Sequence, residues 1–394
     1  RTFVTHRHML EWTTAAQAAR LHSDGGTAQT TFRRILPSIL FVAALSILIL
    51  VANPRALAVA APFFVAWILS AQIADWISRP TVRKTEKLTA QEQRRLRALA
   101  RRTWLFYESF VGPKENWLPP DHFQESPRGV IAHRTSPTNI GLYLLSALAA
   151  FDFGYLRMAN FILRVQFTFD TLDQMGRHRG HFLNWIDTSN LRPLPPAYVS
   201  TVDSGNLAAA MVALQQACLE LRQQVVCRPV RWQGLLDTIA IVTDTLRATT
   251  GARDGLPGSI ADLCDCLAKM ETSVEQAIRD PSCATSALAD LLGPQHEELD
   301  RRLRRIAEDE SAPVDAQTLH TVRLYISRVS QHLEGMRRER DEAMPWLALM
   351  ATPPNIFNER ECPEALSRAF ERVNSFIPAN PRWHEVGEHA AQVR

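Results

Sequence analysis

The sequence predicts an all-α protein in which a two-helix transmembrane hairpin precedes a larger helical domain. Two long uncharged stretches, 35–52 and 56–74, lie close together in the first quarter of the chain. After them, apolar residues recur mostly at helical spacing, and strand signals are short and sparse. The 46% hydrophobic content over 394 residues allows a sizeable core, so a disordered or fibrous protein is excluded.

The two uncharged stretches favour membrane spans because each is close to the roughly 20 residues that cross a hydrocarbon core. Only 53–55 separates them, which is too short for anything but an antiparallel hairpin. Basic residues flank the pair on its outer sides, and the positive-inside rule then places both ends in the cytoplasm: Arg33, Arg34, Arg79, Arg83, Lys84 and Lys87. A buried helical hairpin of a soluble domain is the alternative.

The charge balance argues against a nucleic-acid partner. Lys and Arg number 44 against 41 Asp and Glu, so the net charge is only +3. The six cysteines show no paired framework, and Cys264 and Cys266 point to different faces of a helix, so we interpret all six as reduced structural thiols. His178 and His181 could share a helix face and bind a metal, but Gly180 between them favours a loop.

Beyond 80 the pattern is that of a soluble helical domain. Thr89 can cap a first helix, and this helix ends at a polar, Pro-rich loop over 112–129. Ser136 as N-cap and Pro137 at the first position predict the start of a second helix. Apolar residues occur on all sides of that helix, which is typical of a helix buried all round.

The character of the chain changes after a further helix and a second helix of buried character. These are predicted at 154–175 and 202–221, on either side of a long loop or short hairpin, and amphipathic helices with solvated faces begin at about 251. Acid-to-base pairs four residues apart support one of them: Glu297 with Arg301, Glu298 with Arg302, and Asp300 with Arg304. A later apolar stripe is interpreted as a packing face: Leu319, Val322, Tyr325, Val329, Leu333 and Met336.

Polar loops that contain aromatic residues occur where the buried helices begin or end, at 114–125, 133–139, 181–188 and 198–206. Buried polar groups need partners, so these groups must bond one another or a ligand. Indole rings stack on sugar C–H faces, and carboxylates, amides and guanidinium groups match paired hydroxyls, so the residue types suggest a neutral polyhydroxylated ligand. Taken singly, each residue is better explained by capping, ion pairing or core packing; taken together, the two interpretations stand level.

Long strings in these loops closely resemble cyclic β-1,2-glucan synthases. The strings are ENWLPPDHFQE, AHRTSPTNIGLYLLSALAAFDFG, RGHFLNWIDT and YVSTVDSGNLA, with WTTAAQA at 12–18. The resemblance is dense over about 95–220 and looser beyond. It implies a very large bacterial inner-membrane enzyme, in which a UDP-glucose-dependent glycosyltransferase region is joined to a glucoamylase-like (α/α)6 barrel that closes the glucan ring by transglycosylation.

On this resemblance the chain is expected to be an internal fragment. Its expected parts are a cytoplasmic juxtamembrane segment at 1–34, the hairpin at 35–79, the first part of an (α/α)6-barrel-like domain at 80–250, and an amphipathic helical continuation at 251–394. The catalytic carboxylates are expected downstream of Arg394, with no metal in the chain and UDP-glucose serving the upstream region. The residues expected to bind glucan are Trp117, His133, Arg134, Asn139, Asn184, Trp185, Asp187 and Asp203.

The expected partners are the β-1,2-glucan chain, the lipid bilayer and the rest of the same polypeptide, with a multi-pass location in the inner membrane and the soluble part in the cytoplasm. The full enzyme is expected to act as a glycosyltransferase and transglycosylase through a covalent glycosyl intermediate, whereas the fragment alone is expected to be inactive. A non-catalytic, membrane-tethered glucan-binding or scaffold segment is the rival hypothesis, and a purely structural helical spacer is a third.

Overall fold

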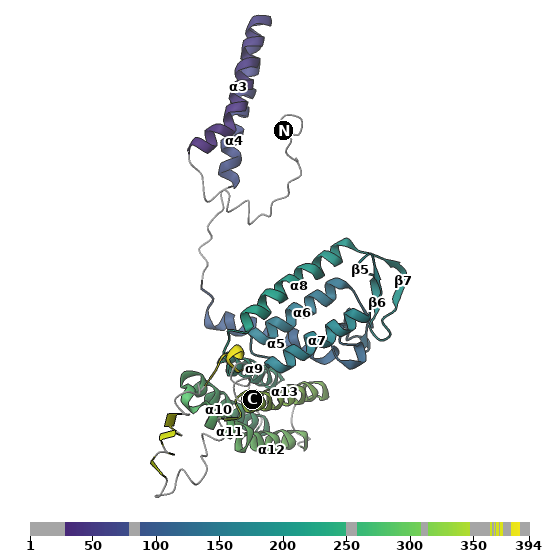
Figure 1. The fold of residues 1–394 in the computed structure, drawn as a ribbon, viewed down its shortest axis with the longest axis vertical. Coiled ribbons are helices and arrows are strands. Elements are labelled where there is room, and N and C mark those ends of the chain that lie inside the picture. The colour runs from purple at the N-terminus through teal and green to yellow at the C-terminus, as the bar shows by residue number, and fades with distance from the viewer. Residues whose placement is uncertain are drawn as a thin grey trace. The chain divides into compact units, whose positions relative to one another are not determined.

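The protein is mostly helical in its computed structural model, and it divides into two compact units, 1–87 and 88–394 (Figure 1). The structure describes residues 28–78, 87–249, 258–308, 314–346, 363, 364, 366, 368, 369, 371, 372 and 380–386. The string at 12–18 and Cys362 lie outside the described residues. The predicted domain boundaries at 34, 79 and 250 stay predictions.

The described part of the first unit is a pair of helices, α3 (Ala28–Ala52) and α4 (Ala56–Ser78), joined by a tight turn. The turn is closed by the N–H of Asn53, which donates to Ile49 O at 2.8 Å, and by the N–H of Ala56, which donates to Asn53 O at 3.0 Å. Across the hairpin the rings of Phe41 and Trp67 lie 5.3 Å apart. A helical hairpin therefore forms at the predicted place.

The prediction that this hairpin crosses a membrane was wrong. Among the described residues, no helix has both the length and the apolar run that crossing a bilayer requires. The predicted multi-pass topology loses its support together with the membrane crossing. The barrel part of the predicted fold class remains a prediction.

The second unit begins with a cluster of four helices: α5 (Ala90–Phe110), α6 (Pro137–Asp152), α7 (Met158–Gln174) and α8 (Thr201–Leu221). The predicted caps are confirmed. The hydroxyl of Thr89 accepts from Glu92 N at 3.2 Å, and the hydroxyl of Ser136 accepts from Asn139 N at 3.2 Å, with Pro137 in the first turn.

Helices α6 and α8 pack closely and run in the same direction. Near their starts, the side-chain amide of Asn206 donates to the Thr138 hydroxyl at 3.1 Å. One turn further on, Gly141 lies against α8, where an added Cβ would meet the Ala210 Cβ at 3.1 Å. Both helices therefore begin at one end of the cluster. The prediction that α6 is buried on all sides was wrong at Leu142, which is 52% exposed.

Short strands form where the sequence predicts loops or a short hairpin. The largest sheet is antiparallel, in the order β3 (Arg134–Thr135), β6 (Asn184–Asp187) and β7 (Pro193–Tyr198). Two smaller pairs are β1 (Phe123–Gln124) with β2 (Val130–Ile131), and β4 (Arg177–His178) with β5 (His181–Phe182). In Figure 1 the strands β5, β6 and β7 lie at one end of α6 and α8.

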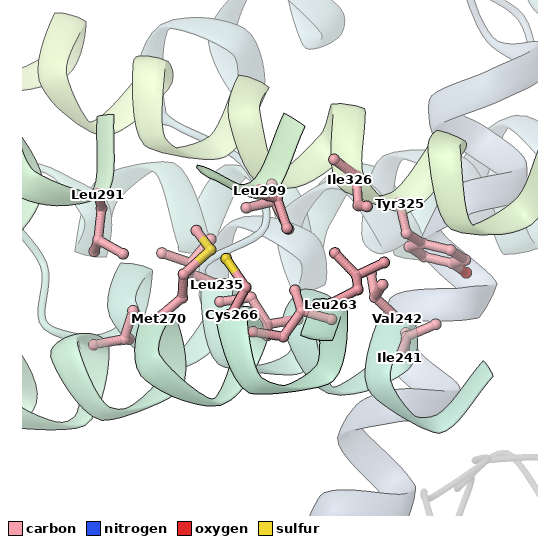
Figure 2. Packing of buried hydrophobic residues seen from close by; sticks show 14 of the residues in the cluster. Leu235, Ile241, Val242, Leu263, Cys266, Met270, Leu291, Leu299, Tyr325 and Ile326 are labelled. Carbon is pink, nitrogen blue, oxygen red and sulfur yellow. The ribbon is translucent and has the colours of Figure 1, made fainter. Parts of the chain in front are cut away.

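The second cluster contains α9 (Val230–Thr249), α10 (Gly258–Arg279), α11 (Ala284–Leu292), α12 (Pro294–Glu308) and α13 (Ala316–Ala343). Its core is continuous across these helices, as Figure 2 shows for residues such as Leu235, Leu263, Met270 and Tyr325. Because α9 supplies part of this core, the second cluster begins before the predicted change of character at about 251.

Side chains predicted to pack in the second cluster do so. Val322, Tyr325, Val329 and Leu333 are buried, and Leu319 and Met336 pack half-buried against them, so the interpretation of this stripe as a packing face is confirmed. The described cysteines are free thiols, as predicted: Cys218, Cys227, Cys264, Cys266 and Cys283. Cys264 and Cys266 are both buried, because α10 is covered on more than one side.

A buried ion pair joins the two clusters. The carboxylate of Glu339 in α13 accepts from Met158 N at 2.7 Å, and its Oε2 lies 3.7 Å from Arg231 Nε. Arg231 Nη1 also donates to Gly154 O at 2.7 Å. Burial lowers the pKa of Arg231 to about 10 although Glu339 opposes the shift, and burial raises the pKa of Glu339. For both groups, the effect of burial on the pKa is larger than that of the opposite charge. The main role of this pair is therefore to fix how the two clusters fit together, and its net contribution to stability is small.

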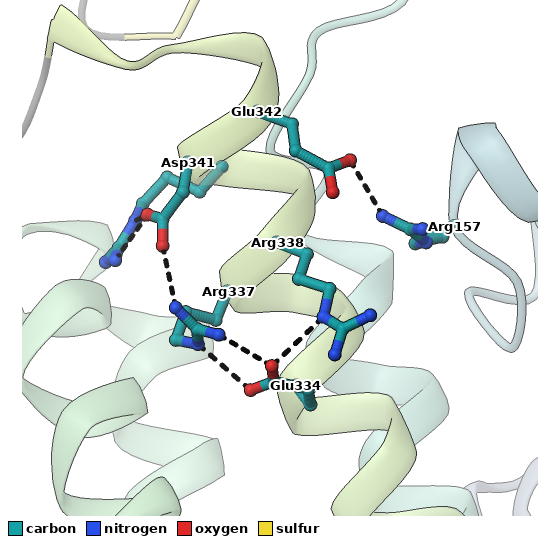
Figure 3. Close-up of polar contacts among 7 residues, drawn as sticks. Arg157, Glu334, Arg337, Arg338, Asp341 and Glu342 are labelled. Atoms are coloured by element: carbon teal, nitrogen blue, oxygen red, sulfur yellow. Dashed lines mark hydrogen bonds and ion pairs between the residues drawn. The ribbon is translucent and has the colours of Figure 1, made fainter.

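An exposed pair lies beside the buried one. Glu342, also in α13, accepts from Arg157 Nη1 at 3.0 Å, and its side chain is 60% exposed (Figure 3). The same helix carries a surface network in which Glu334 pairs with Arg337 and Arg338. Hydrogen bonds from Arg337 and Arg338 lower the pKa of Glu334 to about 2.

Removing the buried carboxylate is expected to cost much more than removing the exposed one. Glu339→Ala leaves the Arg231 charge buried and without its partner, which should lower the free energy of unfolding by about 3–5 kcal/mol. Glu342→Ala, the matched control three residues further along α13, should change it by about 0–1 kcal/mol. Urea unfolding followed by circular dichroism measures both, and similar losses for the two variants would contradict the prediction.

Candidate functional site

The predicted glucan-binding residues gather at the end of the first cluster where α6 and α8 begin. The sheet β3–β6–β7 covers this end (Figure 1). Arg134 pairs with Asp187 in the register of β3 and β6, and burial alternates along β6. Because side chains alternate across a strand, Arg134, Trp185 and Asp187 share the outer face of the sheet, whereas Thr135 and Asn184 lie on its buried inner face.

On the outer face, Arg134 is already paired. Its Nη2 donates to Asp121 Oδ2 at 3.0 Å, and its guanidinium carbon lies 5.4 Å from the centre of the Trp185 ring. Asn139 Nδ2 donates to the other oxygen of Asp121 at 3.3 Å. Partial burial raises the pKa of Asp121, but hydrogen bonds from Arg134, His122 and Asn139 outweigh that effect and hold the pKa below its usual range.

Asp187 ends β6 and closes the turn that follows. One of its carboxylate oxygens, Oδ1, accepts from Ser189 N at 2.8 Å, from Ser189 Oγ at 2.5 Å and from Asn190 N at 3.3 Å. The hydrogen bond from the Ser189 hydroxyl is the main reason that the pKa of Asp187 is lowered, and backbone bonds and the nearby His133 add to it. Asp187 therefore carries its charge on the outer face of the sheet.

Asp203 lies inside, between the two helix starts. Its backbone N–H donates to Ser200 Oγ at 3.2 Å, in the first turn of α8. Burial raises the pKa of Asp203, but hydrogen bonds from Ser200, Thr138, Ser136 and Asn184 lower it further than burial raises it. The carboxylate thus joins the caps of two helices, and its charge is favoured by their N-terminal dipoles.

Some buried oxygens beside Asp203 are not bonded. Among the described residues, Thr135 Oγ1, Asn184 Oδ1 and Ser204 Oγ are buried without a hydrogen-bond partner. Thr135 is 0% and Asn184 2% exposed. Buried polar atoms are normally satisfied, so these three oxygens are places where water or a ligand group would be favourable.

Trp117 and His133 are attached to other parts of the cluster. The Trp117 ring stacks on Phe167 of α7 at 4.8 Å, and its carbonyl accepts from Thr168 Oγ1 at 3.1 Å. His133 Nδ1 bonds to Glu115 Oε1 at 2.9 Å. Glu115 is the last residue of the 3-10 turn η1 (Pro113–Glu115). Trp117 thus packs against α7 from the loop after η1, and His133 borders the outer face of the sheet.

The structure brings His133, Arg134, Trp185 and Asp187 together on or beside the outer face, whereas Asn184 and Asp203 lie below it. The sequence interpretation missed Glu115, Asp121 and Thr188 as members of this site. Glu115 and Asp121 stand inside a loop string that the prediction singled out, but their partners are 13 to 73 residues away, so no local spacing indicated them.

Two surface hollows in the described part of the chain lie away from this site. One of 280 Å³ lies between α5 and α6 and has an apolar lining that includes Leu96, Trp104 and Phe153. Another of 450 Å³ lies between α5, α9 and α10, with Arg97 and Asp237 in its wall. Neither of these two hollows is lined by the predicted glucan-binding residues.

The fold and the site together define a mostly helical protein that carries a polar, aromatic surface at the shared start of two parallel helices. No protein-family model matches the chain. Over 249 residues it is 38% identical to the cyclic beta-(1,2)-glucan synthase NdvB of Rhizobium meliloti, a match that takes in 63% of this chain. The chain spans only 9% of the length of that relative. It is therefore related to a segment of a cyclic glucan synthase.

Acid should weaken the contribution of Asp203 to stability. Its folded-state pKa lies below the unfolded value of about 3.9, so the unfolded chain binds the proton first as the pH falls. The stability from this carboxylate is present above about pH 4 and is lost as the pH falls through the folded pKa. Asp203→Asn should therefore lower the free energy of unfolding by about 1 kcal/mol at pH 7 and by much less near pH 3.

Urea titrations at the two pH values measure this difference. Asp290→Asn serves as the control, because Asp290 is exposed in the last turn of α11, away from any N-terminal cap, and it should change stability by less than about 0.5 kcal/mol at either pH. If Asp203→Asn is equally destabilising at both pH values, the charge of the carboxylate is not what links the helix caps.

Proposed function

We propose that this chain is a segment of a cyclic β-1,2-glucan synthase and that its outer sheet face binds the β-1,2-glucan chain. The similarity to NdvB supports the class of enzyme. The observation that carries the assignment to this surface is the half-buried Trp185, which lies beside Arg134 on the face that also carries Asp187 and that the exposed His133 borders. These groups come from β3 and β6, which a single sheet holds in fixed register.

The chemistry of this surface suits a neutral, polyhydroxylated ligand. An indole ring provides a flat apolar area on which sugar C–H groups can stack. Asp121 and Asp187 can accept hydrogen bonds from hydroxyls, and both have lowered pKa values, so they stay ionised at neutral pH. Arg134 balances only part of this negative charge, because its guanidinium group is paired with Asp121. An anionic ligand would therefore be repelled.

The catalytic carboxylates are assigned by this proposal to another part of the longer enzyme. A general acid in glycoside chemistry needs a raised pKa so that it holds a proton at neutral pH. Asp121, Asp187 and Asp203 all have lowered pKa values, which makes them unsuitable as that acid. In the longer enzyme, UDP-glucose would supply the glucosyl units, and a carboxylate nucleophile would hold the chain as a covalent intermediate until its own end displaces the enzyme.

The hydrogen bonds of the site carboxylates favour a second candidate function, a glucan-binding or scaffold segment without catalysis. The carboxylates of the site already accept hydrogen bonds from Arg134, Ser189 and neighbouring cap residues. These hydrogen bonds fix the positions of the side chains that form the surface. A fixed surface is sufficient for binding glucan, whereas catalysis also requires a proton donor and a nucleophile. The two functions differ in one outcome, because only an enzyme converts linear glucan into products of different length or into rings.

Calorimetry with linear β-1,2-glucans and the chain 1–394 tests the binding surface. Wild type should bind, and Trp185→Ala should weaken the affinity by at least about tenfold, or about 1.4 kcal/mol, because it removes the stacking platform. Trp67→Ala is the matched control: this ring is 49% exposed in α4 of the other unit, and its loss should leave the affinity unchanged.

Two results would count against the proposal. The absence of heat from wild type at millimolar glucan would favour the structural spacer, and equal losses for Trp185→Ala and Trp67→Ala would place the binding surface elsewhere. Chromatography of the glucan after incubation separates the two candidate functions. Unchanged chain lengths would support a binding segment, and rings or redistributed lengths would show catalysis by this chain alone.

A further inference from the structure

A buried carboxylate beside the outer face is bonded by two side chains from distant loops. The Glu115 side chain is only 7% exposed. Its oxygens accept from His133 Nδ1 at 2.9 and 3.1 Å, and Oε2 also accepts from Thr188 Oγ1. Two donors converge on one carboxylate, so Glu115 holds both side chains in place.

Glu115 determines which nitrogen of the His133 ring carries the proton. A carboxylate accepts hydrogen bonds, so Nδ1 of His133 must be the donor. In a neutral imidazole the other nitrogen, Nε2, is then an acceptor without a proton. The His133 side chain is 53% exposed, and among the described residues its ring hydrogen bonds are made through Nδ1. The ring can therefore offer Nε2 to a ligand.

The backbone around the ring is held from three segments of the chain. The N–H of Thr188, just after β6, donates to His133 O at 3.2 Å. The side-chain amide of Asn116, just after η1, donates to Thr188 O at 2.8 Å. Because these bonds join η1, β3 and β6, the position of the ring is set by the sheet and does not depend on a single loop.

The charges near His133 favour a neutral partner that donates a hydrogen bond. Glu115 is in contact with the ring, and the interaction of Asp187 with His133 contributes to the lowered pKa of Asp187. The neighbouring cation, Arg134, lies 3.0 Å from Asp121 and is balanced by it. A sugar hydroxyl can donate to Nε2 without adding negative charge to this acidic surface, whereas a phosphate cannot.

We propose that Glu115 and Thr188 orient His133 so that its Nε2 accepts a hydrogen bond from one hydroxyl of the bound glucan. Glu115 and Thr188 act as positioning residues, and His133 touches the ligand. The inference rests on the proposed binding of glucan to the outer face. It adds that Nε2 of His133 is the acceptor in this contact. It also adds Glu115 and Thr188, which lie in the predicted loops but were not selected as site residues.

Nitrogen NMR of the isotope-labelled chain tests the polarity without any ligand. Once the pH is high enough for the ring to be neutral, wild type should show His133 with a proton on Nδ1 and none on Nε2. In Glu115→Gln the ring loses its carboxylate acceptor, and the proton should move largely to Nε2. The exposed His320 of α13 is the internal control and should be the same in both proteins. A proton on Nε2 of His133 in wild type would overturn the proposal.

Glucan affinity tests the contact itself. His133→Ala and Glu115→Gln should each weaken binding by about 3- to 10-fold, and the double variant should bind no more weakly than His133→Ala alone, since Glu115 acts through the ring. His320→Ala should bind as wild type does. If Glu115→Gln does not fold, a glucan titration of wild type decides instead: Nε2 of His133 should shift and that of His320 should not.

The failure of this inference is distinguishable from that of the proposed function. Wild-type affinity in both His133→Ala and Glu115→Gln would overturn the inference and leave glucan binding in place. No binding by wild type would remove the proposed function and this inference together. Additive losses in the double variant would also overturn it, because Glu115 would then contribute separately from the ring.

Discussion

The close, parallel contact between α6 and α8 is the constraint on which the rest of the site depends. Gly141 permits it, since a side chain there would press on Ala210 at 3.1 Å. Two helices that begin side by side leave several backbone N–H groups at one place, and each needs an acceptor. The hydroxyls of Ser136 and Ser200 meet that need, and the carboxylate of Asp203 is bonded in turn by the side chains around them. The polar residues at this end are therefore first of all a consequence of helix geometry.

The sheet then separates two layers of polar groups with different roles. Its inner face brings Asn184 and Thr135 to the helix caps, where burial is almost complete. Its outer face carries Arg134, Trp185 and Asp187 toward the surface. A residue type alone does not tell which layer it belongs to, because adjacent positions on a strand point to opposite sides. Asn184 and Trp185 are neighbours in the sequence and lie in different environments.

Charged groups at the junction of the two clusters show how the second unit is held together. The Arg231–Glu339 pair is almost fully buried, and burial shifts the pKa of both groups against their charged forms. Such a pair is retained where its geometry matters, here to align α9 and α13 with the turn after α6 that contains Gly154. The core around it, from Leu235 to Tyr325, supplies the attraction.

Short-range chemistry is what the sequence by itself determined. The caps at Thr89 and Ser136 and the apolar stripe of α13 depend on residues within a turn or two of one another, so spacing predicts them. Composition was less informative for the first unit, where two uncharged runs were mistaken for membrane-crossing helices. Only the tertiary structure decided which polar groups meet. Glu115 finds His133 and Thr188 across 18 and 73 residues, and that meeting depends on how three loops return to the same helix ends, which no local pattern encodes.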